Sequence, residues 1–473
     1  MNTSSITADF IVVANRLPVD RIIEPDGKTT WRTSPGGLVT ALEPVMQQRG
    51  GAWVGWHGAP DEVVEPFAHD GFTVVPIELT SADVTEYYEG FSNATLWPLF
   101  HDSVAFPEFH REWWHAYRKV NARFAQRTAE VAAPGATVWV QDYQLLLLPQ
   151  LLRELRPDLK IGFFLHIPFP PIELYMQIPW RRELLEGLLG ADLVGFQIPA
   201  GASNFLRLTR KHTMHRVERD TVRVDDRNCV VRAFPISIDT AGFAELANSE
   251  AAIAEADELL AELGNPKKVF LGVDRLDYTK GLRQRVRAMG ELFSEGHLDP
   301  NETVFLQIAT PSREKVEEYR RLRDDIDLLV GRINSQVGGV GRPAIVYRHS
   351  TFPRASMAAF YRIADVMVVT PLRDGMNLVA KEYIACHPDN NGALVLSEFA
   401  GAARELKQAY LVNPYDLDGM KSALMQAATD PESTRQRRMR ALRKQVTEYD
   451  IAKWADDFLT ILAEVNDQLV DQL

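Results

Sequence analysis

The stretch VMVVTPLRDGMNLVAKEYIAC, residues 366–386, decides the fold of this chain. Its first five residues are apolar and mostly β-branched, which predicts a strand buried on both faces. Pro371 ends this strand, and the Asp374-Gly375 pair predicts a tight turn before a helix that starts near Met376. The first turn of such a helix directs unbonded backbone N–H groups at one point, and that point attracts anions.

Two carboxylates accompany this anion-attracting point. Asp374 lies in the turn, and Glu382 lies two turns into the predicted helix. Carboxylates repel phosphate, but they accept hydrogen bonds from sugar hydroxyls. The combination therefore predicts a sugar attached to a phosphate, as in a nucleotide-sugar. An ordinary βα turn of a parallel sheet fits the same residues.

The composition limits the classes of function. A chain of 473 residues is long enough for two or three domains, and 46% apolar with 25% charged residues is typical of a globular protein. The net charge of −12 argues against general binding to nucleic acid or anionic membranes. Cys229 and Cys386 offer neither a disulfide framework nor a metal-binding spacing. We expect a cytoplasmic protein, because no signal segment or membrane span is recognisable.

Strands and helices alternate along the whole chain, which predicts right-handed crossovers and parallel, doubly wound sheets. The first series contains the apolar runs at residues 10–18, 52–56, 72–77, 138–142, 161–171, 193–197 and 230–235, with a helix at 112–132. A second series begins at residues 269–273 and includes residues 366–370.

A segment that resembles a hinge, residues 235–239, separates the two series, and Asp239 is placed to cap the helix that follows. The expected fold is α/β, with two Rossmann-like domains facing across a cleft. We place the domains at residues 1–238 and 239–450. A C-terminal helix, residues 451–473, is expected to pack back on the first domain.

Several polar residues of the first series lie where ligands bind in such sheets, at the carboxyl ends of strands. These are Arg16, Asp142 and His166, each of which also fits a structural role. Gly36 and Gly37 precede a helical pattern but match neither the dinucleotide nor the P-loop fingerprint. In the aromatic segment 86–101, Tyr88 and Trp97 fit either a sugar-stacking wall or core packing.

The second series places cations after its first two strands. DRLDYTKG carries Arg275 and Lys280, and TPSRE carries Arg313. Arg binds phosphate oxygens in a forked grip and Lys adds a mobile charge, so these cations together favour a phosphate-binding cleft. The D-x-D triplet at 325–327 lies in an amphipathic helical pattern and not in the extended loop that a metal site on a donor diphosphate needs.

Four motifs in this order identify a family resemblance: FSNATLWP, GFFLHIPFP, DRLDYTKG and TPLRDGMNLVAKEY. Together with Arg16 and the Gly36-Gly37 pair, they closely resemble the trehalose-6-phosphate synthases over residues 10–450. These are retaining glycosyltransferases with two Rossmann domains. The resemblance implies a nucleotide-glucose donor, a glucose 6-phosphate acceptor and a homo-oligomer, either a dimer or a tetramer.

The resemblance also implies roles for the donor-binding residues. Arg275 and Lys280 bind the diphosphate, Gly36 and Gly37 close over it, and Phe352 contacts the base. Helix-terminal amides and a carboxylate for the ribose come from Leu378, Val379 and Glu382. The transferred glucose is held by Asp374, Met376 and Asn377, and His166 lies beside it.

For the acceptor, the resemblance implies binding by Arg16, Tyr88, Asp142 and Arg313, with Trp97 and Ile167 selecting the α-anomer. The catalytic set is Asp142, His166, Arg275, Lys280 and Asp374. The implied path is a same-face transfer through an oxocarbenium-like state without an enzyme nucleophile. The two cations take the place of a metal ion at the leaving diphosphate, so no cofactor is implied.

One departure from the family pattern stands out. The family usually reads HDYHLL, whereas this chain reads QDYQLL, with Gln141 and Gln144 in place of two histidines. The response to pH at this point and the nucleotide of the donor stay open. Two other functions also stay open: a sucrose-phosphate or glycogen synthase, and a catalytically silent subunit that binds sugar phosphates. Arg16 and Arg313 favour a small phosphorylated acceptor, and the intact set of cations and carboxylates argues against a silent subunit.

Overall fold

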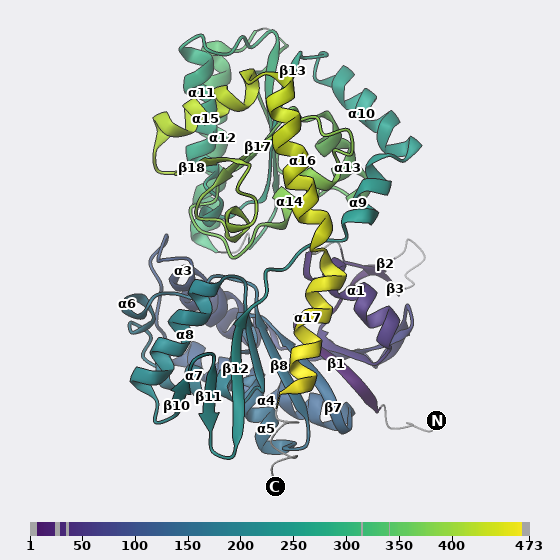
Figure 1. The fold of residues 1–473 in the computed structure, drawn as a ribbon, viewed down its shortest axis with the longest axis vertical. Coiled ribbons are helices and arrows are strands. Elements are labelled where there is room, and N and C mark those ends of the chain that lie inside the picture. The colour runs from purple at the N-terminus through teal and green to yellow at the C-terminus, as the bar shows by residue number, and fades with distance from the viewer. Residues whose placement is uncertain (1–6, 24–28, 35–36, 314–315, 340, 466–473) are drawn as a thin grey trace. The chain divides into compact units, whose positions relative to one another are not determined.

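The computed structural model describes residues 7–23, 29–34, 37–313, 316–339 and 341–465. The chain divides into two compact units (Figure 1). The first comprises Met1–Ile236 and Ala452–Leu473, and the second comprises Ser237–Ile451. Each unit is built around one sheet, and each sheet has its own core.

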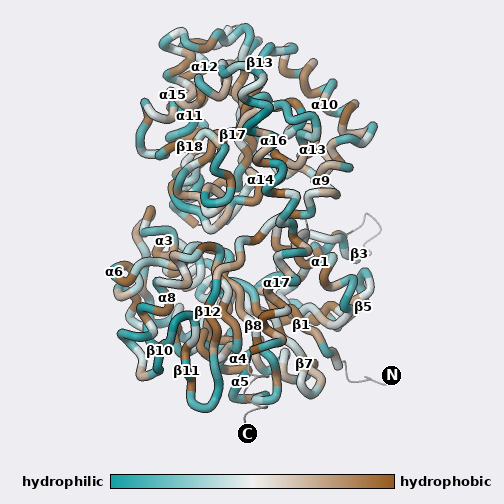
Figure 2. The backbone as a smooth tube through the Cα atoms, in the orientation of Figure 1, coloured by the Kyte–Doolittle hydropathy of each residue, from teal (hydrophilic) through white to brown (hydrophobic). Residues whose placement is uncertain are grey.

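The sheet of the first unit has ten strands in the order β10-β11-β12-β9-β8-β7-β1-β4-β6-β5. Its parallel part consists of β1 (Ala8–Arg16), β4 (Ala52–Trp56), β6 (Phe72–Ile77), β7 (Ala132–Gln141), β8 (Lys160–Leu165), β9 (Leu193–Phe196) and β12 (Arg227–Ala233). The antiparallel edge strands are β5 (Phe67–His69), β10 (Arg216–Glu218) and β11 (Thr221–Val224). The hydropathy colouring is brown along β1 and β8, whereas the β10–β11 edge is mostly teal (Figure 2).

Helices connect these strands, and a separate hairpin of β2 (Val19–Ile23) and β3 (Thr29–Thr33) precedes the first of them. The connecting helices are α1 (Gly37–Arg49), α2 (Ser81–Asp83), α3 (Trp97–Phe100), α4 (Arg111–Val131), α5 (Leu148–Leu155), α6 (Ile172–Tyr175), α7 (Arg181–Leu189) and α8 (Pro199–His212). The aromatic segment without a clear period forms a wide π-type helix, Val84–Leu96, whose end is marked by a bond from the Trp97 amide to the Ser92 carbonyl. Because this wider helix turns less per residue than an α-helix, the 3.6-residue pattern is absent.

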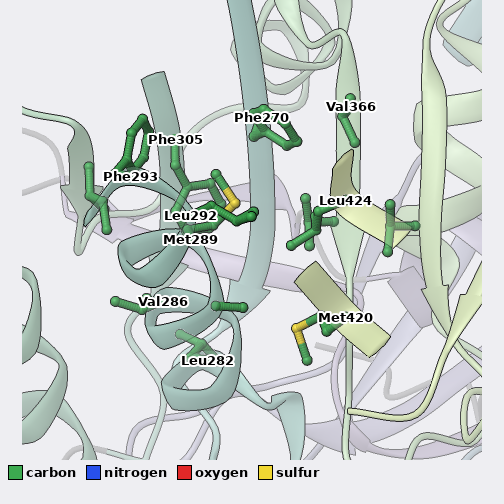
Figure 3. Close-up of a cluster of buried hydrophobic side chains, with 14 of the residues drawn as sticks. Phe270, Leu282, Val286, Met289, Leu292, Phe293, Phe305, Val366, Met420 and Leu424 are labelled. Atoms are coloured by element: carbon green, nitrogen blue, oxygen red, sulfur yellow. The ribbon is translucent and has the colours of Figure 1, made fainter. Parts of the chain in front are cut away.

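The second unit contains a six-stranded parallel sheet in the order β15-β14-β13-β16-β17-β18. Its strands are β13 (Lys268–Arg275), β14 (Thr303–Thr310), β15 (Ile345–Arg348), β16 (Val366–Val369), β17 (Ala393–Ser397) and β18 (Tyr410–Val412). The helices are α9 (Thr240–Ala247), α10 (Glu250–Glu262), α11 (Leu282–Ser294), α12 (Glu317–Val337), α13 (Arg354–Ile363), α14 (Leu378–Ala385), α15 (Leu417–Thr429) and α16 (Glu432–Glu448). Side chains of α11 and α15 pack on one face of the sheet to form its core (Figure 3).

Local details in the second unit confirm some predictions and correct one. Asp239 caps α9, accepting a 2.9 Å hydrogen bond from the Gly242 amide. Asp325 of the D-x-D triplet lies within α12, as its helical pattern predicts. The helix expected near Met376 begins instead at Leu378. The reason is Asn377, whose φ of 78° is not helical and whose side chain accepts a bond from the Ala380 amide.

The last described helix, α17 (Ile451–Glu464), packs on the sheet of the first unit. The Phe458 ring lies 4.6 Å from the Trp139 ring, and Trp454 donates to the Phe234 carbonyl. Gly162 and Gly195 leave room for this contact, because a Cβ at either position would lie within 2.8 Å of Phe458. Residues 466–473 of the predicted helix lie outside the described residues.

We expect Phe458→Ala to reduce the free energy of unfolding by roughly 3–5 kcal/mol, because it opens a cavity between α17 and the sheet. Lys453→Ala on the exposed face of α17 removes an i,i+4 ion pair to Asp457, and we expect a much smaller loss. Urea unfolding followed by tryptophan fluorescence measures both. Equal losses in the two variants would contradict the packing of α17.

Candidate active site

In each sheet the chain first adds strands on one side of the first strand and then adds strands on the other side. The candidate residues lie at this change of side. In the first unit the chain runs from β1 through β4 to β6 and then returns to β7 on the other side of β1. In the second unit it runs from β13 through β14 to β15 and returns to β16. Ligands of open parallel sheets bind outside the carboxyl ends of strands at such switch points. Arg16 and Asp142 flank the first switch point, and Arg275 and Asp374 flank the second.

In the first unit, Arg16 and Tyr88 meet around Trp56. The Arg16 guanidinium lies 5.1 Å from the centre of the Trp56 ring, and the Tyr88 ring lies 6.3 Å from the same ring. Gly58 makes this possible: its φ is 98°, and a Cβ there would overlap the guanidinium. Arg16 also forms a 3.5 Å ion pair with Asp20. Trp56 and Gly58 support Arg16, although the sequence analysis did not single them out.

Asp142 and His166 are brought together at the ends of β7 and β8. Asp142 has a φ of 74°. Its Oδ1 accepts a 3.1 Å hydrogen bond from the His166 backbone amide. Burial of the imidazole lowers the pKa of His166 to about 3, so the ring is neutral at physiological pH. This pair therefore presents one carboxylate and one uncharged imidazole.

Trp97 and Ile167, predicted to select the anomer, are both buried in the first unit. The Trp97 ring lies 4.2 Å from His101 and 5.6 Å from Tyr143. Their role in anomer selection stays a prediction. Gly37 opens α1, whereas Gly36 lies outside the described residues.

The three predicted cations of the second unit surround a buried carboxylate, that of Asp277. Its Oδ2 lies 3.7 Å from nitrogens of both Arg275 and Arg313. Tyr319, from α12, donates to the same oxygen at 3.2 Å and accepts a bond from Arg313. Asp277 Oδ1 accepts bonds from the Thr279 amide and hydroxyl.

Electrostatics keep Asp277 ionised in this buried position. Burial opposes ionisation, but Arg313, Arg275 and Lys280 outweigh it and lower the pKa of Asp277 to about 2. Asp277 is not among the site residues predicted from the sequence. Its place between the two cations in the DRLDYTKG motif was the available signal, because clustered cations need a nearby anion.

Lys280 and Asp374 form a 2.6 Å ion pair at the same switch point. Asn377 donates to the same Asp374 carboxylate at 3.1 Å, so the carboxylate is held beside the first turn of α14. Leu378 and Val379 occupy that turn and are half-buried, and Met376 is buried just before it. Tyr361 donates to Glu382 at 2.7 Å, and burial raises the pKa of Glu382.

Phe352 borders a cavity of about 590 Å³ in the second unit. The cavity runs between α10, α13, β14 and β15, and the Phe352 ring packs edge-on against Phe360 at 4.9 Å. A flat aromatic base fits beside such a ring.

Within the described residues, no cluster of three or more His, Cys, Asp or Glu side chains could hold a metal ion. The helices of the described ranges are all too short or too polar to cross a membrane.

We expect Asp277→Asn to reduce the free energy of unfolding at pH 7 by roughly 2–3 kcal/mol, corresponding to the lowered pKa of the carboxylate. Because the folded-state pKa lies below the unfolded value, this stabilisation is present above about pH 4 and is lost as the pH falls toward 2. Asp325→Asn makes the same chemical change in an exposed pair with Arg283, and we expect less than about 1 kcal/mol. Urea titrations at pH 7 and pH 3 measure the difference, which should shrink at pH 3, and similar losses in both variants at pH 7 would rule out the buried anion.

Comparison with known proteins shows the family of this chain. The family described as Glycosyltransferase family 20 matches residues 8–464. A trehalose-6-phosphate synthase from Mycolicibacterium gilvum is 56% identical over 474 residues, covering 97% of this chain and 94% of that protein.

Two solved structures share the fold over nearly the whole length. An alpha,alpha-trehalose-phosphate synthase (UDP-forming) from Burkholderia xenovorans, in complex with glucose-6-phosphate, has a TM-score of 0.88 and 36% identity, covering 96% of this chain and 99% of that one. The E. coli protein bound with UDP-2-fluoro glucose has a TM-score of 0.86 and 34% identity, with 96% and 99% covered. The predicted α/β class with two Rossmann-like domains is confirmed. This chain belongs to glycosyltransferase family 20, among the trehalose-6-phosphate synthases that its motifs resemble.

Proposed function

We propose that this chain transfers glucose from a nucleotide-glucose donor to glucose 6-phosphate with retention at the donor carbon. The products are α,α-trehalose 6-phosphate and a nucleoside diphosphate. The observation that carries this proposal is the cluster of Arg275, Lys280 and Arg313 around Asp277 at a switch point. The ligands named for the two related structures, glucose-6-phosphate and UDP-2-fluoro glucose, support these classes of acceptor and donor.

In the second unit, the donor diphosphate binds Arg275 and Lys280. The Lys280 ammonium has three donors, so it bonds a phosphate oxygen while it keeps its contact with Asp374. Asp374, aided by Met376 and Asn377, then accepts hydrogen bonds from glucose hydroxyls.

The nucleoside occupies the region beyond the first turn of α14. Leu378, Val379 and Glu382 contact the ribose, and Phe352 contacts the base. The Tyr361 hydroxyl donates to one oxygen of Glu382 and orients the carboxyl group for a ribose hydroxyl.

Arg16 in the first unit and Arg313 in the second are the candidate ligands for the acceptor phosphate, because a guanidinium fork matches phosphate oxygens. Tyr88 and Asp142 hold the remainder of glucose 6-phosphate, and Asp142 is oriented by the His166 amide. Trp97 and Ile167 shape the part of the site that admits the α-anomer.

Catalysis follows from placing both reactants and stabilising the departing charge. The bond between the donor anomeric carbon and the diphosphate oxygen breaks, and the anomeric oxygen of glucose 6-phosphate attacks the same face. The proton of that hydroxyl passes to the leaving diphosphate. Arg275 and Lys280 are preorganised by Asp277 and Asp374, so they stabilise the developing negative charge without reorganising.

We also propose that the enzyme works in the cytoplasm, where the buried thiols of Cys229 and Cys386 stay reduced. A dimer or tetramer is the expected assembly, and light scattering of the purified protein tests this expectation.

We expect Lys280→Ala to lower kcat roughly 100- to 1000-fold, because it removes one donor at the leaving group. Its thermal unfolding should change far less than its turnover. Lys267→Ala removes an exposed lysine that is paired with Glu302, and we expect wild-type rates. Nucleotide release under saturating substrates measures both variants. Near-normal turnover of Lys280→Ala would overturn the assignment of the cations.

Nucleotide release also tests the reaction itself. We expect release from at least one of UDP-glucose, ADP-glucose and GDP-glucose when glucose 6-phosphate is present, and none when fructose 6-phosphate replaces it. Release with fructose 6-phosphate would favour a sucrose-phosphate synthase. No release from any donor would favour a silent subunit.

A further inference from the structure

Gln141 is one of the two amides that stand where the family usually has histidine, and it lies directly beside His166. It is the last residue of β7 and is fully buried. Its Oε1 lies 2.9 Å from His166 Nε2. No role in the proposed reaction has been given to it.

The orientation of this amide is set by a second contact. Gln141 Nε2 donates to the Trp139 carbonyl at 3.5 Å, so Oε1 must face the imidazole. The reverse orientation would place the amide oxygen of Gln141 against the Trp139 carbonyl oxygen, where no hydrogen bond can form. A carbonyl oxygen only accepts, so the proton of the neutral imidazole is on His166 Nε2 and the lone pair is on Nδ1.

The surroundings of His166 favour an uncharged ring. The Phe164 ring lies 4.7 Å away, and Trp454 of α17 lies 6.4 Å away. Asp142 is a carboxylate neighbour, and its Oδ1 accepts a hydrogen bond from the backbone amide of His166. Gln197 donates to the His166 carbonyl at 3.4 Å. The low pKa of His166 agrees with this setting.

We propose that Gln141 is a positioning residue that holds His166 as the neutral Nε2–H tautomer, so that Nδ1 accepts a hydrogen bond from a hydroxyl of the transferred glucose. The second half rests on the proposed function, which places glucose beside His166. A histidine at position 141 could donate or accept through its ring nitrogens and could become charged. The amide oxygen accepts at this contact, so it fixes the polarity of the neutral His166 ring between pH 5 and pH 8.

Nitrogen NMR of the full-length protein labelled in histidine tests the tautomer directly. His166→Asn assigns the signals. We expect Nε2 to be protonated and Nδ1 to be unprotonated in wild type from pH 5 to pH 8. Gln141→Glu places a carboxylate at the same point, which raises the pKa of His166, so both nitrogens become protonated at the acidic end of this range. A protonated Nδ1 in wild type, or an unchanged titration in Gln141→Glu, would overturn the proposal.

Kinetics test the contact with glucose. Wild type should show no ionisation of His166 in kcat/KM for the donor, whereas Gln141→Glu should lose activity as the pH falls, because an imidazolium donates where Nδ1 accepted. Gln144→Met, at the other replaced histidine, should keep the wild-type profile, whereas Gln141→Met should lose at least tenfold in kcat/KM.

Donors in which one glucose hydroxyl at a time is replaced by fluorine identify the partner. Fluorine accepts but does not donate, so wild type should discriminate at least tenfold against one of these donors, and Gln141→Glu at low pH should discriminate less. If every fluorinated donor reacts alike while wild type turns over glucose normally, the Nδ1 contact is wrong and the proposed function stands. If wild type releases no nucleotide from any donor, the proposed function fails, and the NMR result alone decides the tautomer.

Discussion

When a parallel sheet has strands on both sides of its first strand, the chain must change once from one side to the other. This constraint creates the openings in which ligands can bind. At the reversal the loops from two neighbouring strands diverge and leave the strand ends open. The first unit reverses between β1 and β7, and the second between β13 and β16. Most of the candidate polar residues in this chain, from Arg16 to Asp374, follow one of these strands or a strand beside them.

Cations that lie close together at such a point repel each other, and buried carboxylates in the second unit offset this repulsion. Asp277 faces two guanidinium groups, and Asp374 faces the Lys280 ammonium. Each carboxylate is itself oriented by neighbours, Thr279 and Tyr319 for Asp277 and Asn377 for Asp374. These contacts hold the cations in place, and preorganisation of this kind is what the proposed stabilisation of a leaving anion requires.

In the first unit, aromatic and amide side chains support the candidate residues. Arg16 rests on Trp56, and His166 is kept neutral by burial and by the contact with Gln141. The helix α17 contributes here as well, because Trp454 lies beside the His166 ring. The far end of the chain thus forms part of the environment of a candidate catalytic residue.

The sequence by itself determined the strand–helix alternation, the capping of α9 by Asp239 and most of the residues that are candidates for the site. These features are encoded locally: apolar runs specify strands, and the ordered motifs carry the cations and carboxylates next to them in the chain. Only the tertiary structure decided the order of strands in each sheet and the anchoring role of Asp277. It also decided the support of Arg16 by Trp56 and Gly58 and the amide orientation of Gln141. Each depends on groups that are distant in sequence, such as Asp277 and Tyr319 or Gln141 and His166. A local pattern does not report which distant side chain supplies the opposite charge or the hydrogen-bond acceptor.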